Sequence, residues 1–129
     1  MAHPLRGATA LTGLGMTPMG RVFGKTATEL AADAIALAIA DAGIEKSNID
    51  GLLVNAGASQ GITLGLQNYC GLENLRLLNH MNGAGSTAAQ MVQYASMAIA
   101  AGMARHVVCV FADTPLSEGK SAGTAYGMR

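Results

Sequence analysis

The sequence predicts an α/β fold of three layers, in which helices cover both faces of a mostly parallel sheet. Three observations carry this prediction. The strand-like runs are short and apolar throughout, as in strands that are buried on both faces. Segments with helical periodicity separate these runs. The resulting order of elements, βαβαβαβ, favours parallel strands that are joined by right-handed crossovers.

The first half of the chain supplies two predicted strands and one strong helix. The apolar, threonine-rich residues 8–14 are expected to form the first strand. Thr26 and Glu29 have the spacing of a capping box, in which each side chain bonds the other residue's backbone N–H. The periodic stretch that follows predicts a helix ending at Gly43. A second, fully apolar strand is expected over 51–57.

The second half continues the same alternation. The patterns indicate a weaker helix over 60–69 and a third strand over 76–81. A long helix over 84–101 and a fourth strand over 105–112 follow. The tail over 113–129 is rich in Gly, Ser and Thr and is expected to be loop. A chain of this length fits one domain, here residues 1–129.

Composition excludes several classes of function. Half of the 129 residues are hydrophobic, and eight basic residues balance eight acidic ones. A neutral chain without a basic run has no electrostatic footprint for nucleic acid. The longest apolar stretch, 30–42, is interrupted by Asp33 and Asp41, so no membrane span is expected. Because the N-terminus lacks the apolar region of a signal peptide, we expect a cytoplasmic protein.

Cysteine and histidine residues give no metal-ligand spacing, so no metal site is expected. Cys109 lies in the apolar run HVVCVFAD, which predicts a small core side chain in a buried strand. Cys70 follows a short helix-like segment and has no basic partner nearby in the sequence. It is therefore not expected to act as a nucleophile.

The junction between the third strand and the long helix is the strongest candidate site. The stretch LLNHMNGAGSTAAQMVQ turns through Asn82, Gly83 and Gly85 before the helix begins. Ligands of α/β folds gather at such junctions, where helix N-termini present free N–H groups. The alternative is an ordinary glycine-rich turn with helix-capping residues, Ser86 among them. Neither a dinucleotide-binding fingerprint nor a phosphate-binding loop with Gly-Lys-Ser/Thr is present.

Three ordered blocks resemble the N-terminal portion of the thiolase superfamily, nearest to the sterol-carrier and lipid-transfer type. They read ALTGLGMTPMGR, ELAADAIALAIADAGIEKSNIDGLLVN and LLNHMNGAGSTAAQMVQYASMAIAAGMARHVVCVFAD. The resemblance covers nearly the whole chain and implies a partial N-terminal thiolase-like domain, one of the two similar α/β halves of such proteins.

The resemblance also implies roles for the residues of the turn. Asn82 occupies the position of the family's acyl-accepting cysteine, while Gly83, Gly85 and Ser86 occupy substrate-binding positions. A carboxamide forms no thioester, so a protein related to acyl-CoA acyltransferases is expected to be inactive alone or non-condensing. In the non-condensing case, N–H groups of the turn, or the Asn82 amide itself, would polarise a thioester carbonyl.

The resemblance leaves two further readings open. In one, the chain is part of an aldolase complex with a small zinc-ribbon/OB-type partner; in the other, it is a non-catalytic interaction or acyl-CoA-binding subunit. No cofactor is expected beyond a coenzyme A thioester ligand. An unpaired sheet edge favours a homodimer or higher oligomer, and the resemblance places residues 75–80 at its interface. Whether a second subunit supplies the missing half stays open from the sequence.

Overall fold

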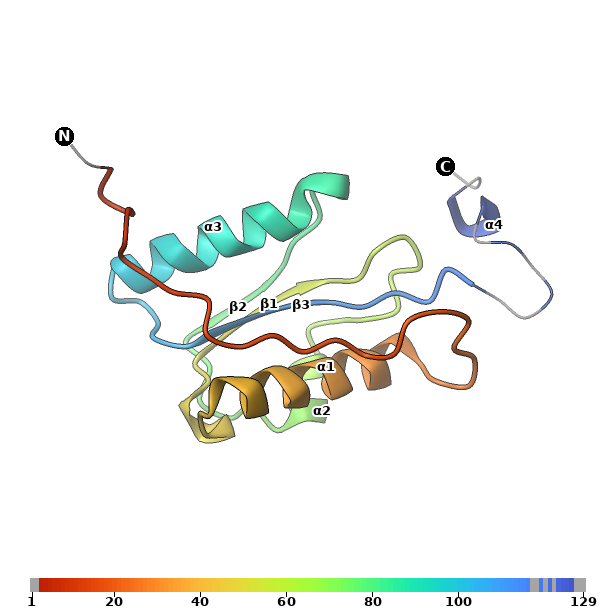
Figure 1. Ribbon diagram of the computed structural model, residues 1–129, viewed down its shortest axis with the longest axis horizontal. Coiled ribbons are helices and arrows are strands. Elements are labelled where there is room, and N and C mark those ends of the chain that lie inside the picture. Colours follow the sequence, from red (N-terminus) through yellow and green to blue (C-terminus); the bar gives the residue numbers. More distant parts are fainter. Residues whose placement is uncertain (1–2, 117–118, 120, 122, 127–129) are drawn as a thin grey trace.

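A computed structural model describes residues 3–116, 119, 121 and 123–126 and shows a three-layered α/β fold (Figure 1). Strands β1 (Gly51–Asn55), β2 (Leu77–His80) and β3 (Val107–Phe111) form one sheet in the order β2-β1-β3, with both pairings parallel. Helices α1 (Ala27–Ala42) and α2 (Leu66–Cys70) lie on one face, and helix α3 (Thr87–Ala100) lies on the other. The predicted fold class is confirmed.

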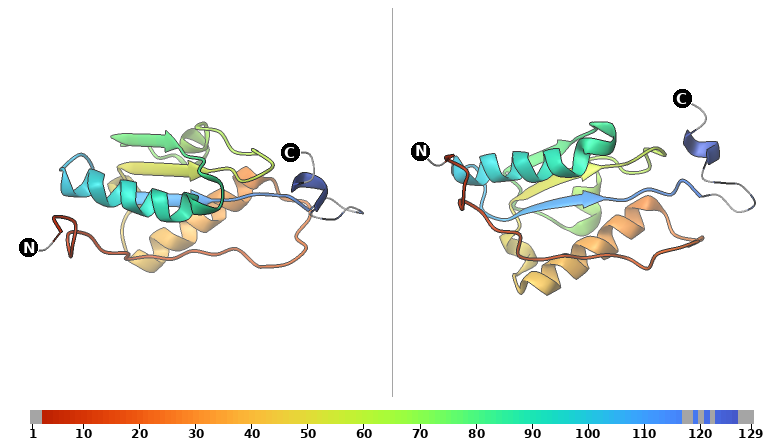
Figure 2. Two further views of the ribbon diagram at one scale, coloured as in Figure 1. Left: turned by 90° about the horizontal axis from the view of Figure 1, so that it is seen from above. Right: turned by 45° about the horizontal axis from the view of Figure 1, so that its top comes forward.

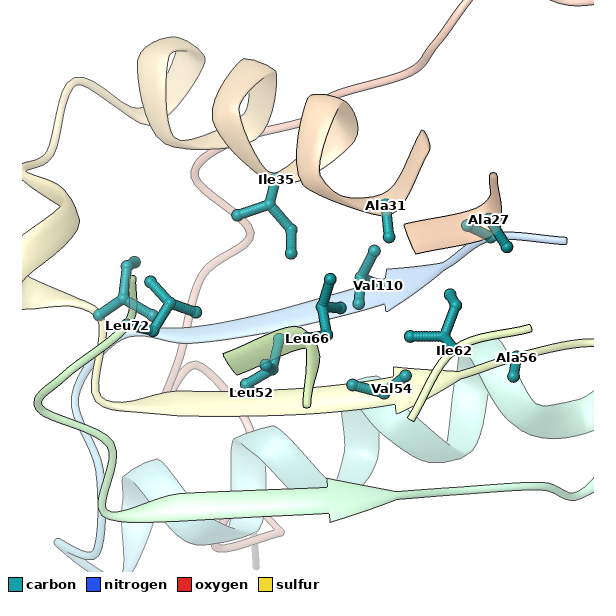
Figure 3. Close-up of a cluster of buried hydrophobic side chains, with 12 residues drawn as sticks. Ala27, Ala31, Ile35, Leu52, Val54, Ala56, Ile62, Leu66, Leu72 and Val110 are labelled. Atoms are coloured by element: carbon teal, nitrogen blue, oxygen red, sulfur yellow. The ribbon is translucent and has the colours of Figure 1, made fainter. Parts of the chain in front are cut away.

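The central strand β1 explains why its sequence is apolar without alternation. All five of its residues are buried, because β2 and β3 flank it and helices cover both faces. Leu52 and Val54 contribute to the core beneath α1 and α2 (Figure 3), whereas Leu53 packs in the separate core beneath α3. Successive side chains of a strand point to opposite faces, so one run of letters supplies both cores.

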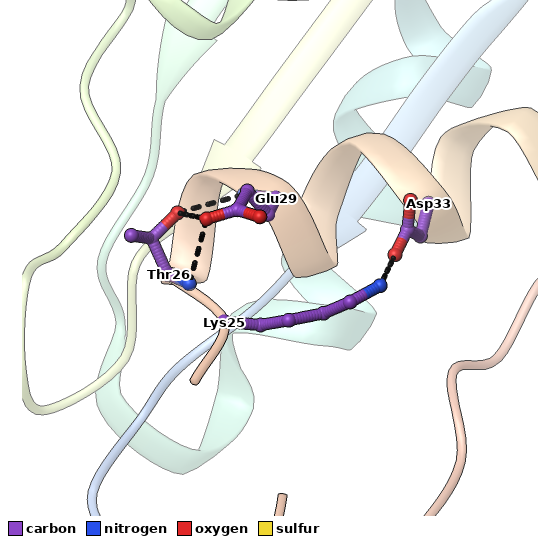
Figure 4. A network of polar contacts seen from close by, with 4 residues as sticks. All are labelled: Lys25, Thr26, Glu29 and Asp33. Atoms are coloured by element: carbon purple, nitrogen blue, oxygen red, sulfur yellow. Dashed lines mark hydrogen bonds and ion pairs between the residues drawn. The ribbon is translucent and has the colours of Figure 1, made fainter. Parts of the chain in front are cut away.

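Helix α1 begins at the predicted capping box (Figure 4). The Glu29 N–H donates to Thr26 Oγ1 at 3.1 Å, and the Thr26 N–H donates to Glu29 Oε1 at 3.3 Å. Lys25 forms an exposed ion pair with Asp33, which lies one turn beyond Glu29. The helix ends at Gly43, whose φ of 69° is the left-handed conformation that glycine adopts without a steric penalty.

Replacing Thr26 by alanine is expected to lower the free energy of unfolding by about 1 kcal/mol, because the Glu29 N–H loses its acceptor. Urea denaturation followed by circular dichroism measures the change. Thr12→Ala is the matched control, since Thr12 is exposed on the N-terminal segment and should shift the midpoint little. Equal effects of the two substitutions would contradict a stabilising role of the capping box.

The predicted first strand, residues 8–14, is extended but is not part of the sheet. The Thr9 and Ser96 hydroxyls share a hydrogen bond of 3.1 Å, and the Leu14 N–H donates to Asp41 at 2.8 Å. Helices thus hold this segment, and it makes no backbone ladder with β3, the edge strand of the described sheet. A cavity of about 130 Å³ lies between the segment, α3 and β3. The extended conformation follows from the local sequence, whereas strand pairing requires an edge within hydrogen-bonding distance.

Other boundaries differ in smaller ways. The weaker helix predicted over 60–69 is confined to α2, because Gln60 has a φ of 54° and the following residues form turns. The long helix is confirmed, with a 3₁₀ turn at Ala84–Ser86 before α3, and a second 3₁₀ turn covers Lys46–Asn48. In the predicted loop tail, the short helix α4 spans Gly123–Tyr126. The remaining tail positions 117–118, 120, 122 and 127–129 lie outside the described residues.

Among the described residues, no helix is both long enough and apolar enough to cross a membrane.

Candidate functional site

A cavity of about 280 Å³ opens where strands β1 and β3 end and helix α3 begins. These ends meet at one edge of the sheet because the strands are parallel (Figure 2). The carboxyl edge of a parallel sheet is where ligands of α/β folds bind. The cavity is lined by Asn55, Ala84, Gly85, Thr87, Ala88, Met91 and Phe111.

Hydrogen bonds within the turn hold its backbone in a tight conformation. The Gly83 N–H donates to Thr87 Oγ1 at 2.8 Å, and that hydroxyl donates to the Ala84 carbonyl at 2.7 Å. Ala84 has a φ of 53°, which is uncommon for a residue with a Cβ. Such conformations persist where surrounding contacts enforce them, and they gather at ligand sites. The turn therefore has the rigidity that a binding site requires.

The four predicted site residues lie close together, but only one of them lines the cavity. Gly85 is a lining residue. Asn82 is exposed at the apex of the turn, where its Oδ1 accepts the Ala84 N–H at 3.3 Å. Gly83 packs against Gln90, and a Cβ at this position would overlap the Gln90 amide.

Ser86 occupies the N-cap position of helix α3, but its side chain does not cap the helix as the alternative reading predicted. Its hydroxyl donates to the Gly83 carbonyl at 2.7 Å and accepts from Gln90 Nε2 at 2.7 Å, and its side chain caps no helix N–H. The 3₁₀ turn takes over the capping, since the Thr87 N–H donates to the Ala84 carbonyl. A 3₁₀ turn satisfies the first N–H groups of a helix without a side-chain cap.

A cysteine introduced at position 82 would test the electrostatics of this turn. In Asn82→Cys the thiolate would accept the Ala84 N–H, which now donates to the Asn82 side chain. We expect the thiol of this variant to react with iodoacetamide at pH 7 about tenfold faster than that of Ala100→Cys. Ala100 is exposed at the opposite end of α3, where the helix dipole disfavours a thiolate. Equal rates, measured with both native cysteines replaced by serine, would contradict an anion-stabilising turn.

Two polar residues near the cavity were missed by the sequence analysis. Asn55 ends β1, is 5% exposed, and bonds both Met81 and Gly57. Asp113 follows β3, and its carboxylate accepts the N–H groups of Ala58 and Ser59 at 2.8 and 3.1 Å. Each residue comes at the end of an apolar run, GLLVN and HVVCVFAD, and this position is the sequence signal that could have identified them.

Neither cysteine lines the cavity or is activated as a nucleophile. Cys109 was predicted to be a core residue, but it is exposed on β3, an edge strand of the described sheet. Its thiol borders the smaller cavity beside residues 9–11, and partial burial there raises its pKa to about 11. Burial likewise raises the pKa of Cys70, and the nearby Lys46 opposes that shift more weakly. Both thiols are therefore protonated at neutral pH.

Among the described residues, the cavity lining contains no acid or base. In the described part of the chain the lining is one amide, one hydroxyl, backbone and apolar side chains. No group of three or more His, Cys, Asp or Glu side chains among the described residues could hold a metal ion. These residues can bind and polarise a ligand, but they cannot transfer a proton.

The α/β fold of this chain is thiolase-like. A solved structure with this fold is 3-oxoacyl-[acyl-carrier-protein] synthase III from Aquifex aeolicus VF5. The chain matches it with a TM-score of 0.65 and 18% sequence identity, over 86% of this chain and 39% of that one. At this identity the match shows the fold alone. No family model matches the chain.

More similar proteins are aldolases and lyases. The chain is 36% identical over 124 residues to a steroid side-chain-cleaving aldolase of Thermomonospora curvata, covering 96% of this chain and 30% of the relative. It is 32% identical over 104 residues to the 17-hydroxy-3-oxo-4-pregnene-20-carboxyl-CoA lyase of Mycobacterium tuberculosis, covering 81% and 27%. A solved Ltp2–ChsH2(DUF35) aldolase matches with a TM-score of 0.71 and 37% identity, over 80% of this chain and 27% of that one.

The chain thus spans less than a third of the length of each of these three relatives. The three matches cover between 80% and 96% of this chain.

Proposed function

We propose that this chain forms the N-terminal part of a thiolase-like subunit in an aldolase complex that cleaves a side chain from a steroid acyl-CoA. The single observation that carries the proposal is the cavity at the N-terminus of α3, which combines a rigid polar turn with the absence of any thiol or titratable group among its lining residues. The similarity to a steroid side-chain-cleaving aldolase and to a pregnene-carboxyl-CoA lyase supports this assignment.

The chemistry of an aldol cleavage suits such a site. A base removes the proton from a β-hydroxyl group, the bond between the α- and β-carbons breaks, and the electron pair moves into the thioester as an enolate. The β-carbon leaves as a ketone or aldehyde, and a proton then returns to the α-carbon. Hydrogen-bond donors that face the thioester oxygen stabilise the enolate. This sequence needs no covalent acyl-enzyme, so an asparagine at position 82 is compatible with it.

A condensing acyltransferase, in contrast, needs a thiolate nucleophile at the turn. Asn82 supplies none, and the two cysteines lie elsewhere with raised pKa values. Since the lining residues include no base, the proposal assigns proton removal to a residue outside them, on another part of the subunit or on a partner.

Partner subunits belong to the same proposal. The described sheet has two edge strands, β2 and β3, whose outer backbone groups can pair with another chain. A second subunit is supported by the aldolase that pairs Ltp2 with a DUF35 protein. We further propose a homodimer that forms through β2, the strand within the predicted interface region 75–80; light scattering of the purified chain tests it.

Calorimetric titration with acetyl-CoA tests the proposed ligand class. The chain is expected to bind acetyl-CoA and to leave 17-hydroxy-3-oxo-4-pregnene-20-carboxyl-CoA uncleaved when alone, because its cavity lacks a base. Cleavage is expected only for a full-length subunit together with a DUF35 partner. Absence of heat with acetyl-CoA would favour the alternative of a non-catalytic interaction subunit, and cleavage by the chain alone would contradict the assignment of the base to another part of the complex.

A further inference from the structure

We infer that Asn55, and not Asn82, supplies the side-chain amide that donates a hydrogen bond to a ligand's carbonyl oxygen in this cavity. The inference rests on the proposed function, and it names the residue that would recognise the thioester. Its basis is the hydrogen-bonding capacity of the two polar side chains that line the cavity, Asn55 and Thr87.

The Thr87 hydroxyl has no proton left for a ligand. It accepts the Gly83 N–H at 2.8 Å and donates its single hydrogen to the Ala84 carbonyl at 2.7 Å. Thr87 is 4% exposed, so the hydroxyl is not free to rotate toward solvent without breaking a buried bond. Its role is to hold the turn in shape.

Asn55 differs because a carboxamide carries two N–H donors. Its Nδ2 donates to the Met81 carbonyl at 2.9 Å, and its Oδ1 accepts the Gly57 N–H at 2.9 Å. These partners fix the orientation of the amide, since a carbonyl only accepts and a backbone N–H only donates. One N–H remains. It belongs to a side chain that is 5% exposed and borders the cavity, where an unused donor needs an acceptor.

Asn82 lacks these properties. It is exposed, it does not border the cavity, and its Oδ1 bonds the backbone of its own turn. Asn55 is also anchored in the central strand, so its amide is held in place before a ligand arrives. A donor that is already oriented stabilises developing charge without a cost of reorganisation.

Two ligands that differ only at the carbonyl test the inference. Acetyl-CoA carries a thioester carbonyl, whereas S-ethyl-CoA carries a methylene group in place of that carbonyl. We expect the native chain to bind acetyl-CoA about threefold to tenfold more tightly than S-ethyl-CoA, as one hydrogen bond provides. In Asn55→Asp, which retains an acceptor for Gly57 but loses the donor, this ratio is expected to fall to about one. Because both ligands contain coenzyme A, the ratio of their affinities in one variant cancels any general effect of the new charge on coenzyme A binding.

Asn74→Asp is the matched control, because Asn74 also donates from its side chain to a backbone carbonyl, that of Ser47, but borders neither described cavity. Its ligand ratio should equal that of the native chain. NMR of the native chain labelled with ¹⁵N-asparagine gives a readout that needs no variant to fold. The Asn55 side-chain amide signals are expected to shift on addition of acetyl-CoA and to stay unchanged with S-ethyl-CoA.

The possible results separate the two proposals. If the ratio persists in Asn55→Asp, or if it collapses in Asn82→Ala instead, Asn55 is not the donor while the ligand class stands. Unmoved Asn55 signals in the presence of bound acetyl-CoA would have the same meaning. If neither ligand binds the native chain, the proposed function fails, and the assignment of Asn55 fails with it.

Discussion

Replacing Gly85 by leucine is expected to weaken acetyl-CoA binding at least tenfold while the fold stays intact. Gly85 lines the cavity, and a Cβ at this position would meet no atom within 4 Å. The backbone therefore accepts a side chain, which then occupies space that the ligand needs. A tenfold loss corresponds to about 1.4 kcal/mol of binding free energy. Calorimetry gives the affinity, and circular dichroism confirms that the variant is folded.

Ala89→Leu provides the control for this substitution. Ala89 is exposed on the same helix but does not line the cavity, so added bulk there should leave the affinity within about twofold of the native value. Equal affinities of the Gly85 and Ala89 variants would show that acetyl-CoA binds elsewhere. That result would remove the observation on which the proposed function rests.

Leu53→Ala is expected to lower the free energy of unfolding by about 2–5 kcal/mol, the largest change in stability predicted for this chain. Leu53 is fully buried in the middle of β1, in the core with Met91 and Ala95 of α3. Truncation removes apolar contacts and leaves a cavity that small neighbouring alanines cannot fill. Because the binding turn leads directly into α3, loosening this core should also weaken acetyl-CoA binding.

The comparison is Leu37→Ala on helix α1, where the leucine is 48% exposed. The same chemical change there should cost well under half as much, since much of the side chain is already in water. Urea denaturation of both variants measures the difference. A Leu53 variant that is as stable as the Leu37 variant would contradict the packing of α3 against β1.

The local sequence predicted helix α1 and the turn that precedes helix α3. Thr26, Glu29 and Gly43 define the helix through bonds between residues that are close in the chain, so the pattern alone was sufficient. The turn at residues 82–86 was likewise identified from its glycines and from its place between a strand and a helix. The assignment of Asn82 to the family's nucleophile position remains a prediction. The Asn82 side chain does not border the cavity.

Segment 8–14 and Cys109 show why the sequence pattern alone did not predict sheet membership and burial. An apolar, threonine-rich run predicts an extended chain, and the run is extended, but its neighbours are helices and not a strand edge. Cys109 lies in an apolar run, yet it is exposed because β3 ends the described sheet. Strand order decides which strand is covered, and strand order depends on contacts that no short window of sequence contains.

The sequence by itself determined the α/β class, the caps of α1 and the glycine-rich turn before α3, because each of these depends on residues that lie near one another in the chain. Only the tertiary structure decided which side chains meet at the cavity. Asn55 bonds Met81 across 26 positions of the chain, and Asp113 bonds Ala58 across 55. Parallel strands bring their carboxyl ends to one edge regardless of separation along the chain, so the donor of this site could be found only once the strands were in register.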